Sequence, residues 1–158
     1  MQQPPITTAE ELCSAIGPNA QSISRWDSTE QMYKPHACGT LFGNFALSSL
    51  EGYEISVGAN TTWIPEGCPV SPEPIDLIKK PGSTGLNYIG FPYNSAISPF
   101  TAEGLCQNIS DAQSISLWDP IEQEYEPHAC GTVFGNFTLS IGTAYEISVS
   151  ANTTWTPG

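Results

Sequence analysis

The second half of the chain repeats the first, and this repeat constrains the fold more than any other feature. The stretch "AQSISRWDSTEQMYKPHACGTLFGNFALS" aligns without a gap with "AQSISLWDPIEQEYEPHACGTVFGNFTLS", at an offset of 92 positions. The alignment continues through "YEISVGANTTW" and "YEISVSANTTW". Agreement this close predicts two copies of one small fold, and a chain of 158 residues is long enough to hold two small domains.

The period is longer than the visibly repeated stretch, because residues from about 67 to 99 have no counterpart before the first copy. We therefore predict a first unit over 1–66 that lacks its opening strands and a second unit over 67–158. The second unit would open with a hairpin at about 75–93, since "IDLIKKPGSTGLNYIGFPY" resembles two apolar strands around a turn. A sheet that lacks strands leaves backbone groups unpaired, so we expect this hairpin to be shared between units or swapped into a dimer.

Each unit is predicted to be mainly β with one short helix. "YEISV" alternates, which places Tyr53, Ile55 and Val57 on one face of a strand. "TTAEELCSAI" is typical of a helix that begins with a capping box formed by Thr8 and Glu11. Several short strands separated by turn residues predict two homologous small modules of β-sandwich or barrel-like type.

Charge and hydropathy exclude two classes of partner. The formal net charge is -12, with only four basic residues, so a phosphate backbone would be repelled. No run of the sequence approaches the roughly 18 apolar residues that a membrane-spanning helix needs. The sequence therefore predicts neither nucleic-acid binding nor membrane insertion.

Four of the five cysteines recur as matched pairs, Cys13 with Cys38 and Cys106 with Cys130. A disulfide in each unit would stabilise it by roughly 3 kcal/mol, which matters for so small a domain. The alternative is a metal site that includes His36, because residues two apart on a strand point to the same side. No fourth ligand was found to repeat, so the prediction is two disulfides, no metal and no cofactor.

The paired cysteines also favour an oxidising compartment. We expect an extracellular or cell-surface protein, of which this chain is a fragment without its signal peptide. Cys68 has no equivalent in the repeat, so its role as a free thiol or as a link between chains stays open.

No motif in the chain predicts catalysis. There is no GxSxG elbow, no HExxH and no cysteine context that marks a nucleophile, so we expect no catalytic residue and no enzyme activity. Aromatic residues offer a different function, because rings exposed on a sheet can stack on sugars. The candidates for such ligand binding are Trp26, Tyr33, Trp118 and Tyr125.

The runs "LNYIGFPY", "LCQNI", "ISLWDPIEQEY", "GNFTLSIGTAYEISV" and "TTWTPG" together resemble tandem repeat modules of large secreted or cell-surface bacterial proteins. Those modules read roughly "WNLISLPL", a short helix, "VxxWDxxTQxY" and "FxLxPGxGYxV". The resemblance covers the second unit and all but the opening of the first. The paired cysteines lie outside that pattern, and "TAYEISV" lacks its glycine.

Such modules are non-catalytic, β-rich appendages. The resemblance thus implies a structural or adhesive role in display or protein–protein contact, and it brings no catalytic residue. The expected partner is a protein, including a second copy of the chain through residues 75–93. The alternatives are a carbohydrate-binding module that takes a polysaccharide and, less favoured, a His/Cys metal-binding protein.

Overall fold

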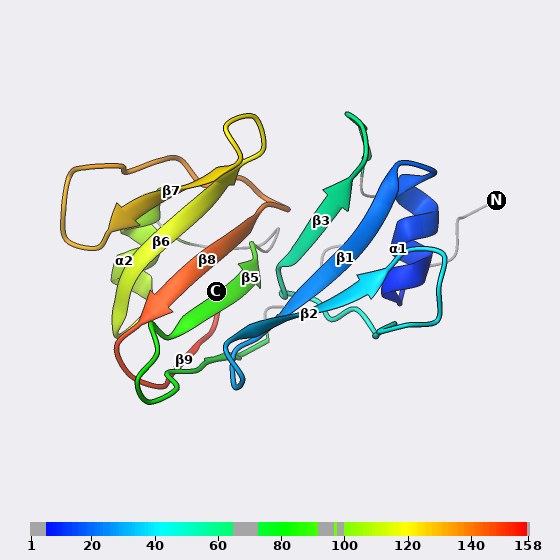
Figure 1. Cartoon of the computed structure of the whole chain (residues 1–158). Coiled ribbons are helices and arrows are strands. Elements are labelled where there is room, and N and C mark those ends of the chain that lie inside the picture. The colour runs from blue at the N-terminus through cyan, green and yellow to red at the C-terminus, as the bar shows by residue number, and fades with distance from the viewer. Residues whose placement is uncertain (1–5, 65–72, 92–96, 98–99, 158) are drawn as a thin grey trace.

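The computed structural model describes residues 6–64, 73–91, 97 and 100–157. Two units lie side by side, each with a helix against one face of an antiparallel sheet (Figure 1). The first unit comprises α1 (Ala9–Ile16), β1 (Ala20–Asp27), β2 (Met32–Ala37) and β3 (Tyr53–Val57). The second comprises β4 (Ile75–Leu77), β5 (Leu86–Gly90), α2 (Ala102–Asn108), β6 (Ala112–Asp119), β7 (Glu124–Ala129), β8 (Ala144–Val149) and β9 (Thr153–Trp155). The predicted mainly β fold with one short helix per unit is confirmed, and no sheet in the described residues closes into a barrel.

The helices begin where the capping residues predict. The Thr8 hydroxyl accepts the N–H of Glu11, and the Glu11 carboxylate accepts the N–H of Thr8, which completes the capping box of α1. In α2, Thr101 caps the helix in the same way, but Gly104 stands at the position of Glu11 and supplies no carboxylate. Both helices therefore have the threonine cap, and only α1 has the glutamate that completes the capping box.

The two main sheets have the same plan, but the second has one strand more. The first sheet has the order β2-β1-β3 and the second has the order β5-β8-β6-β7. β5 lies antiparallel along the outer edge of β8, with Tyr88 opposite Glu146. In the described residues, the equivalent outer edge of β3 carries no strand.

The segment predicted as a hairpin at about 75–93 forms two strands that do not pair with each other. β4 pairs with β9 in a separate two-stranded sheet, whereas β5 pairs with β8. Both pairings lie within the second unit of the same chain. Residues 92 and 93 lie outside the described part of the chain. Long-range pairing thus replaces the local hairpin, and it buries Leu77 of β4 and Ile89 of β5 in the core of the second unit.

The tripeptide "TTW" occurs at residues 61–63 and again at residues 153–155. Only the second copy is a strand, β9, and it pairs with β4. Trp155 is buried there, whereas Trp63 is only partly buried. The same sequence therefore becomes a strand only where a partner strand is present.

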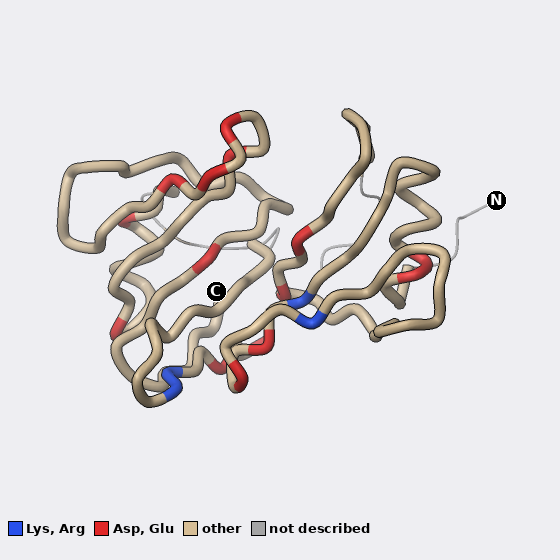
Figure 2. The backbone as a smooth tube through the Cα atoms, viewed as in Figure 1, with Lys and Arg blue, Asp and Glu red and all other residues tan. Residues whose placement is uncertain are grey.

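An approximate two-fold rotation relates the two units. The equivalent strands β1 and β6 run in opposite directions (Figure 1), and the hydroxyls of the equivalent residues Tyr33 and Tyr125 meet at 3.3 Å. Acidic residues occur along the chain in both units (Figure 2). They outnumber the four basic residues, in keeping with the net charge of -12.

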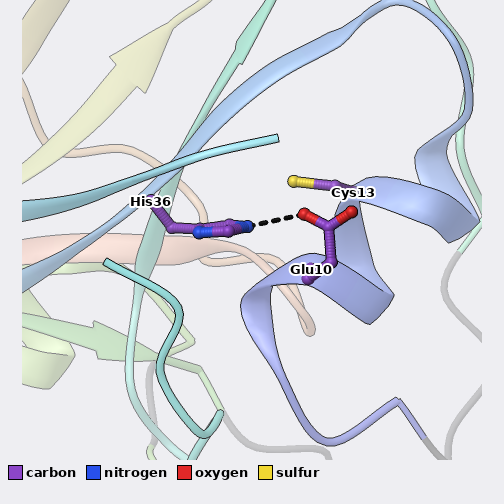
Figure 3. A group of neighbouring side chains, drawn as sticks. All are labelled: Glu10, Cys13 and His36. Carbon is purple, nitrogen blue, oxygen red and sulfur yellow. Dashed lines mark hydrogen bonds and ion pairs between the residues drawn. The ribbon is translucent and has the colours of Figure 1, made fainter. Parts of the chain in front are cut away.

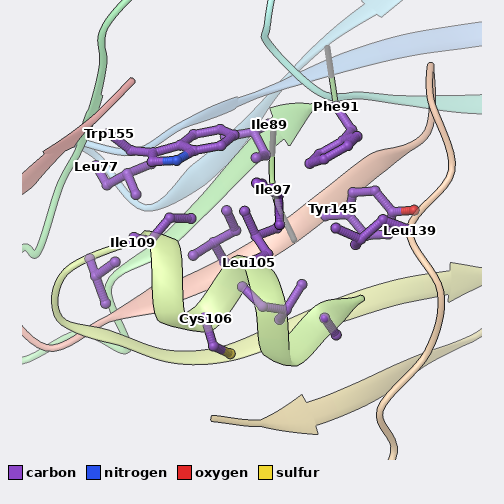
Figure 4. Close-up of a cluster of buried hydrophobic side chains, with 14 residues drawn as sticks. Leu77, Ile89, Phe91, Ile97, Leu105, Cys106, Ile109, Leu139, Tyr145 and Trp155 are labelled. Carbon is purple, nitrogen blue, oxygen red and sulfur yellow. The ribbon is translucent and has the colours of Figure 1, made fainter. Parts of the chain in front are cut away.

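The core of the second unit lies between α2, the main sheet and the β4–β9 pair (Figure 4). Tyr145, Ile147 and Val149 of β8 are at most 1% exposed. The first unit has a smaller buried cluster, made of Ala9, Leu12, Cys13, Ile16 and Ile23. On its β3 strand, Ile55 and Val57 are 38% and 41% exposed, although they occupy the positions of Ile147 and Val149.

Candidate functional site

The repeated histidine of "HACGT" lies in the interior of each unit. His36 on β2 is fully buried, and both of its ring nitrogens have partners. Nδ1 lies 2.9 Å from the carbonyl oxygen of Phe42, and Nε2 lies 2.8 Å from Oε2 of Glu10 on α1 (Figure 3). The ring thus joins a strand, a helix and the loop that follows "HACGT".

The loop sequence "FGNF" explains why it recurs with the histidine. Gly43 has a φ of 69°, and a Cβ there would meet the carbonyl oxygen of Pro35 at 2.3 Å, so only glycine fits. This turn presents the Phe42 carbonyl to His36. The next residue, Asn44, accepts the N–H of Glu10 at 3.1 Å and so fastens the loop to the start of α1.

The Phe42 carbonyl can only accept a hydrogen bond, so Nδ1 of His36 donates to it, and Nε2 faces the Glu10 carboxylate within ion-pair distance. The hydrogen bond from His36, followed by that from the backbone N–H of Gly39, lowers the pKa of the Glu10 carboxyl below its usual range. The carboxylate of Glu10 on α1 is therefore bound by donors from β2 and from the turn after β2, which are far from α1 in the sequence.

A metal site was the alternative for this cluster, and the structure supplies the ligand that the sequence analysis missed. Atoms of Glu10, Cys13 and His36 lie within 4.8 Å of one another. Cys13, however, is bonded to Cys38 with an S–S distance of 2.02 Å. A sulfur in a disulfide is not a thiolate, and the thiolate is the form that binds metal. While the disulfide is intact, the cluster is a structural ion pair beside a covalent link.

The second unit contains the same arrangement at equivalent positions. His128 is buried, with Nδ1 at 2.9 Å from the Phe134 carbonyl and Nε2 at 2.8 Å from Glu103. Cys106 is bonded to Cys130 at 2.06 Å. The pKa of the Glu103 carboxyl is lowered first by the hydrogen bond from His128 and then by that from the backbone N–H of Gly131. Glu103 also accepts a hydrogen bond from Nε2 of Gln107 at 3.1 Å, a partner that Glu10 lacks. The histidine, its carbonyl partner, the carboxylate and the disulfide nevertheless recur at equivalent positions, which indicates a shared structural role.

The aromatic candidates for ligand binding meet between the two units. Trp26 packs edge-on to Tyr33 with ring centroids 4.9 Å apart, and both rings lie against Tyr88 of β5 at 5.3 and 5.6 Å. Burial, and after it the hydrogen bond to Tyr125, raises the pKa of the Tyr33 phenol. Trp26 and Tyr33 therefore form part of the contact between the units and do not present a free stacking surface.

The first hairpin also holds the backbone of β5. Nε1 of Trp26 donates to the Leu86 carbonyl at 2.7 Å, and Nε2 of Gln31 donates to the same oxygen at 2.8 Å. The Leu86 N–H donates to Oε1 of Gln31 at 3.0 Å. Sequence analysis did not single out Gln31 or Tyr88, although Gln31 belongs to the repeated "WD" motif and Tyr88 to an alternating apolar strand.

The other two aromatic candidates, Trp118 and Tyr125, line a cleft between the units. Its volume is about 260 Å³, and Trp118 is 41% exposed beside it. Two carboxylates also line it, those of Glu54 and Glu146, and the latter accepts hydrogen bonds from Tyr88 and Ser116. We call this space the aromatic cleft, and its lining consists of Tyr53, Glu54, Ile55, Tyr88, Trp118, Pro120, Tyr125, Ala144 and Glu146.

Comparison of the chain with models of protein families, with curated proteins and with solved structures gives no match. The described residues include no helix long and apolar enough to cross a bilayer. The functional argument therefore depends on the geometry of this chain and on the differences between its two units.

Proposed function

We propose that the chain is a non-catalytic structural module of an extracellular or cell-surface protein and that it makes contacts with other proteins. The observation that carries this proposal is the uncovered β3 strand of the first unit. Its outer edge has no strand partner in the described residues, and Ile55 and Val57 beside that edge each expose more than a third of their surface. An unpaired strand edge next to exposed apolar residues is typical of a surface that binds another chain.

Three further features support the proposal. The two disulfides favour an oxidising compartment. His36 and His128 are the side chains best suited to acid–base or metal chemistry. Both are fully buried, and their ring nitrogens are engaged in structural hydrogen bonds. The sequence resemblance to tandem modules of bacterial surface proteins implies the same display or adhesive role.

Adhesion between beads coated with the chain tests the proposal, with the second copy of the chain as the partner. We expect the beads to cluster, and the mass of the free chain measured by light scattering to rise with concentration. The double variant Ile55→Glu/Val57→Glu should abolish both effects, because two buried charges oppose any contact on that face. The matched control places glutamate at Leu41 and Val133, which are exposed, lie at equivalent positions in the loops after β2 and β7, and do not line the aromatic cleft. Clustering that survives the first variant, or fails in the wild type, would contradict the proposal.

Carbohydrate binding is the second candidate, and the aromatic cleft is the observation that favours it. A sugar ring can stack on the exposed face of Trp118, while Glu54 accepts hydrogen bonds from its hydroxyls. Neutral oligosaccharides titrated into the chain would then quench or shift tryptophan fluorescence, and Trp118→Ala would remove the response. No change with any oligosaccharide tested would argue against this candidate.

A further inference from the structure

The aromatic cleft has the same walls as the site that holds β5. In the second unit, β5 lies between the edge of β8 and the hairpin of the first unit, against Glu146 on one side and Trp26 and Tyr33 on the other. The approximate two-fold rotation maps these walls onto Glu54, Trp118 and Tyr125, which line the cleft. The cleft thus lies beside β3 in the first unit as the β5 site lies beside β8 in the second unit.

The edge of β3 forms one wall of the counterpart. Tyr53, Glu54 and Ile55 of the cleft lining are equivalent to Tyr145, Glu146 and Ile147, which lie opposite Ile89, Tyr88 and Asn87 of β5. The residues just before β3 lie along the other edge of β5, where the Gly52 N–H donates to the Tyr88 carbonyl at 3.3 Å and the Leu50 carbonyl accepts the Gly90 N–H at 2.9 Å. Beyond that point, the hydrogen-bonding groups along the outer edge of β3 remain open to a further strand, because no strand of the described residues lies along them.

The second hairpin forms the other wall and already has the required conformation. Gln123 has a φ of 56°, and its Nε2 donates to the Pro120 carbonyl at 2.7 Å. Gln31 has a φ of 57° and donates to the Ser28 carbonyl at the same distance, and it is Gln31 that also binds the β5 backbone. Trp118 packs on Tyr125 at 4.9 Å, as Trp26 packs on Tyr33. The groups that hold β5 are therefore present twice, and within the described part of the chain only one set of them holds a strand.

We propose that the aromatic cleft and the adjoining β3 edge accept an extended strand of the β5 type, supplied by another copy of the repeat unit. This inference rests on the proposed contact function and names the partner. The incoming strand lies antiparallel to β3, with its tyrosine opposite Glu54 and the isoleucine that follows opposite Tyr53, as the β5–β8 register dictates. Main-chain hydrogen bonds to a sheet edge give such a strand affinity, and pockets for alternate side chains give it specificity.

The chemistry of the cleft matches the side chains of such a strand. The tyrosine ring packs against Trp118 and Tyr125, and its hydroxyl donates to Glu54, as the Tyr88 hydroxyl donates to Glu146. The alternate face of the strand covers Ile55 and Val57, which the equivalent strand in the second unit helps to bury. A strand of this type would thereby remove from water both the unpaired edge of β3 and the exposed side chains of Ile55 and Val57.

The test uses a labelled peptide with the sequence of residues 83–91, "STGLNYIGF", added to the intact oxidised chain. Fluorescence anisotropy should show saturable binding, because main-chain hydrogen bonds to the sheet edge give the added strand its affinity. Trp118→Ala and Ile55→Lys, each made separately, should weaken binding by about tenfold or more. A peptide in which the tyrosine and isoleucine exchange places keeps the composition but puts each side chain on the wrong face, so it should not bind. Amide hydrogen exchange should slow in β3 and stay unchanged in β8.

Each outcome decides the question. Binding that requires Trp118, Ile55 and the correct order of residues supports the proposal. Absence of binding, binding of the exchanged peptide or protection elsewhere than β3 overturns it, and so does a sugar that binds the cleft while the peptide does not. Bead clustering without peptide binding would leave the contact function standing and overturn the strand site. Peptide binding without bead clustering would support the strand site and contradict self-contact as the function.

Discussion

The two units have nearly the same sequence, yet one buries its β-sheet and the other leaves part of it in contact with water. In the second unit, Ile147 and Val149 are completely buried beneath β4, β5 and β9. In the first, Ile55 and Val57 keep more than a third of their surface exposed. The difference lies in the neighbours and not in the strands, because "YEISV" is identical in both. An identical strand can therefore serve as core in one place and as a contact surface in another.

The largest effect should come from the disulfides, and it should differ between the units. Loss of a disulfide that closes a loop of about 25 residues costs roughly 3 kcal/mol. Cys13→Ala/Cys38→Ala should unfold the first unit, because few buried hydrophobic residues remain to hold it. Cys106→Ala/Cys130→Ala should leave the second unit folded but less stable, since its buried cluster is larger. Limited proteolysis with mass mapping would show which unit opens, and equal loss of both units would break the comparison.

Truncation of the equivalent isoleucines Ile147 and Ile55 measures how much each one contributes to the stability of its unit. Ile147→Ala should cost about 3 kcal/mol, because it leaves a cavity in a closed core. Ile55→Ala should cost about 1 kcal/mol or less, because the side chain is already partly in water. Urea unfolding, followed by probes in each unit, gives both values. Equal costs would show that the face of β3 is covered in solution.

Replacement of the buried histidines should give two similar effects, since their surroundings are the same. His36→Ala and His128→Ala should each cost about 2 kcal/mol, because each removes two hydrogen bonds made by a fully buried ring. The same unfolding assay provides the measurement, and Glu10→Gln, which keeps an acceptor oxygen, should cost less. A much smaller cost at one histidine than at the other would show that the clusters are not equivalent.

Acid should weaken both units by a smaller amount. The pKa values of Glu10 and Glu103 are lowered in the folded protein, first by the hydrogen bond from the adjacent histidine. A carboxyl whose pKa is lowered on folding adds stability above the pKa of the unfolded chain, about 4.3, and that stability is lost as the pH falls through the folded pKa. Thermal unfolding between pH 6 and pH 2 should therefore show a decline below about pH 4.3. Glu10→Gln should flatten the part that belongs to the first unit, and an unchanged profile would contradict this assignment.

The repeat, the disulfides and the mainly β fold could be predicted because each depends on local pattern or on matched spacing. Cys13 and Cys38 could be paired only because equivalent cysteines, Cys106 and Cys130, recur in the second copy. The role of Glu10 could not be predicted from spacing, because it meets His36 across 26 positions and from a different element. A signal was present, since Glu10 recurs as Glu103 while its neighbour Glu11 is replaced by Gly104.

The pairing of β4 and β5 was predicted less well. A turn rich in Gly and Pro favours a hairpin between neighbouring strands, but every residue of both strands pairs with a partner at least 54 positions away. Tertiary burial decides such cases, because β5 gains a core position for Ile89 beside Tyr145 that a free hairpin lacks. The aromatic cleft depends on how the two units meet, and no property of either unit's sequence alone specifies that contact.

The disulfides have a mechanical consequence for a chain under tension. Each one closes a loop of 25 or 24 positions that contains both strands of the hairpin and much of the helix. A pulling force passes through the sulfur–sulfur bond and bypasses that loop, so about 85 Å of extended length per unit stays hidden from stretching. In a reducing solution, the same length becomes available. Tension on this protein would thus be borne by the disulfide between α1 and the end of β2, and His36, which lies inside the closed loop, would experience little of that force.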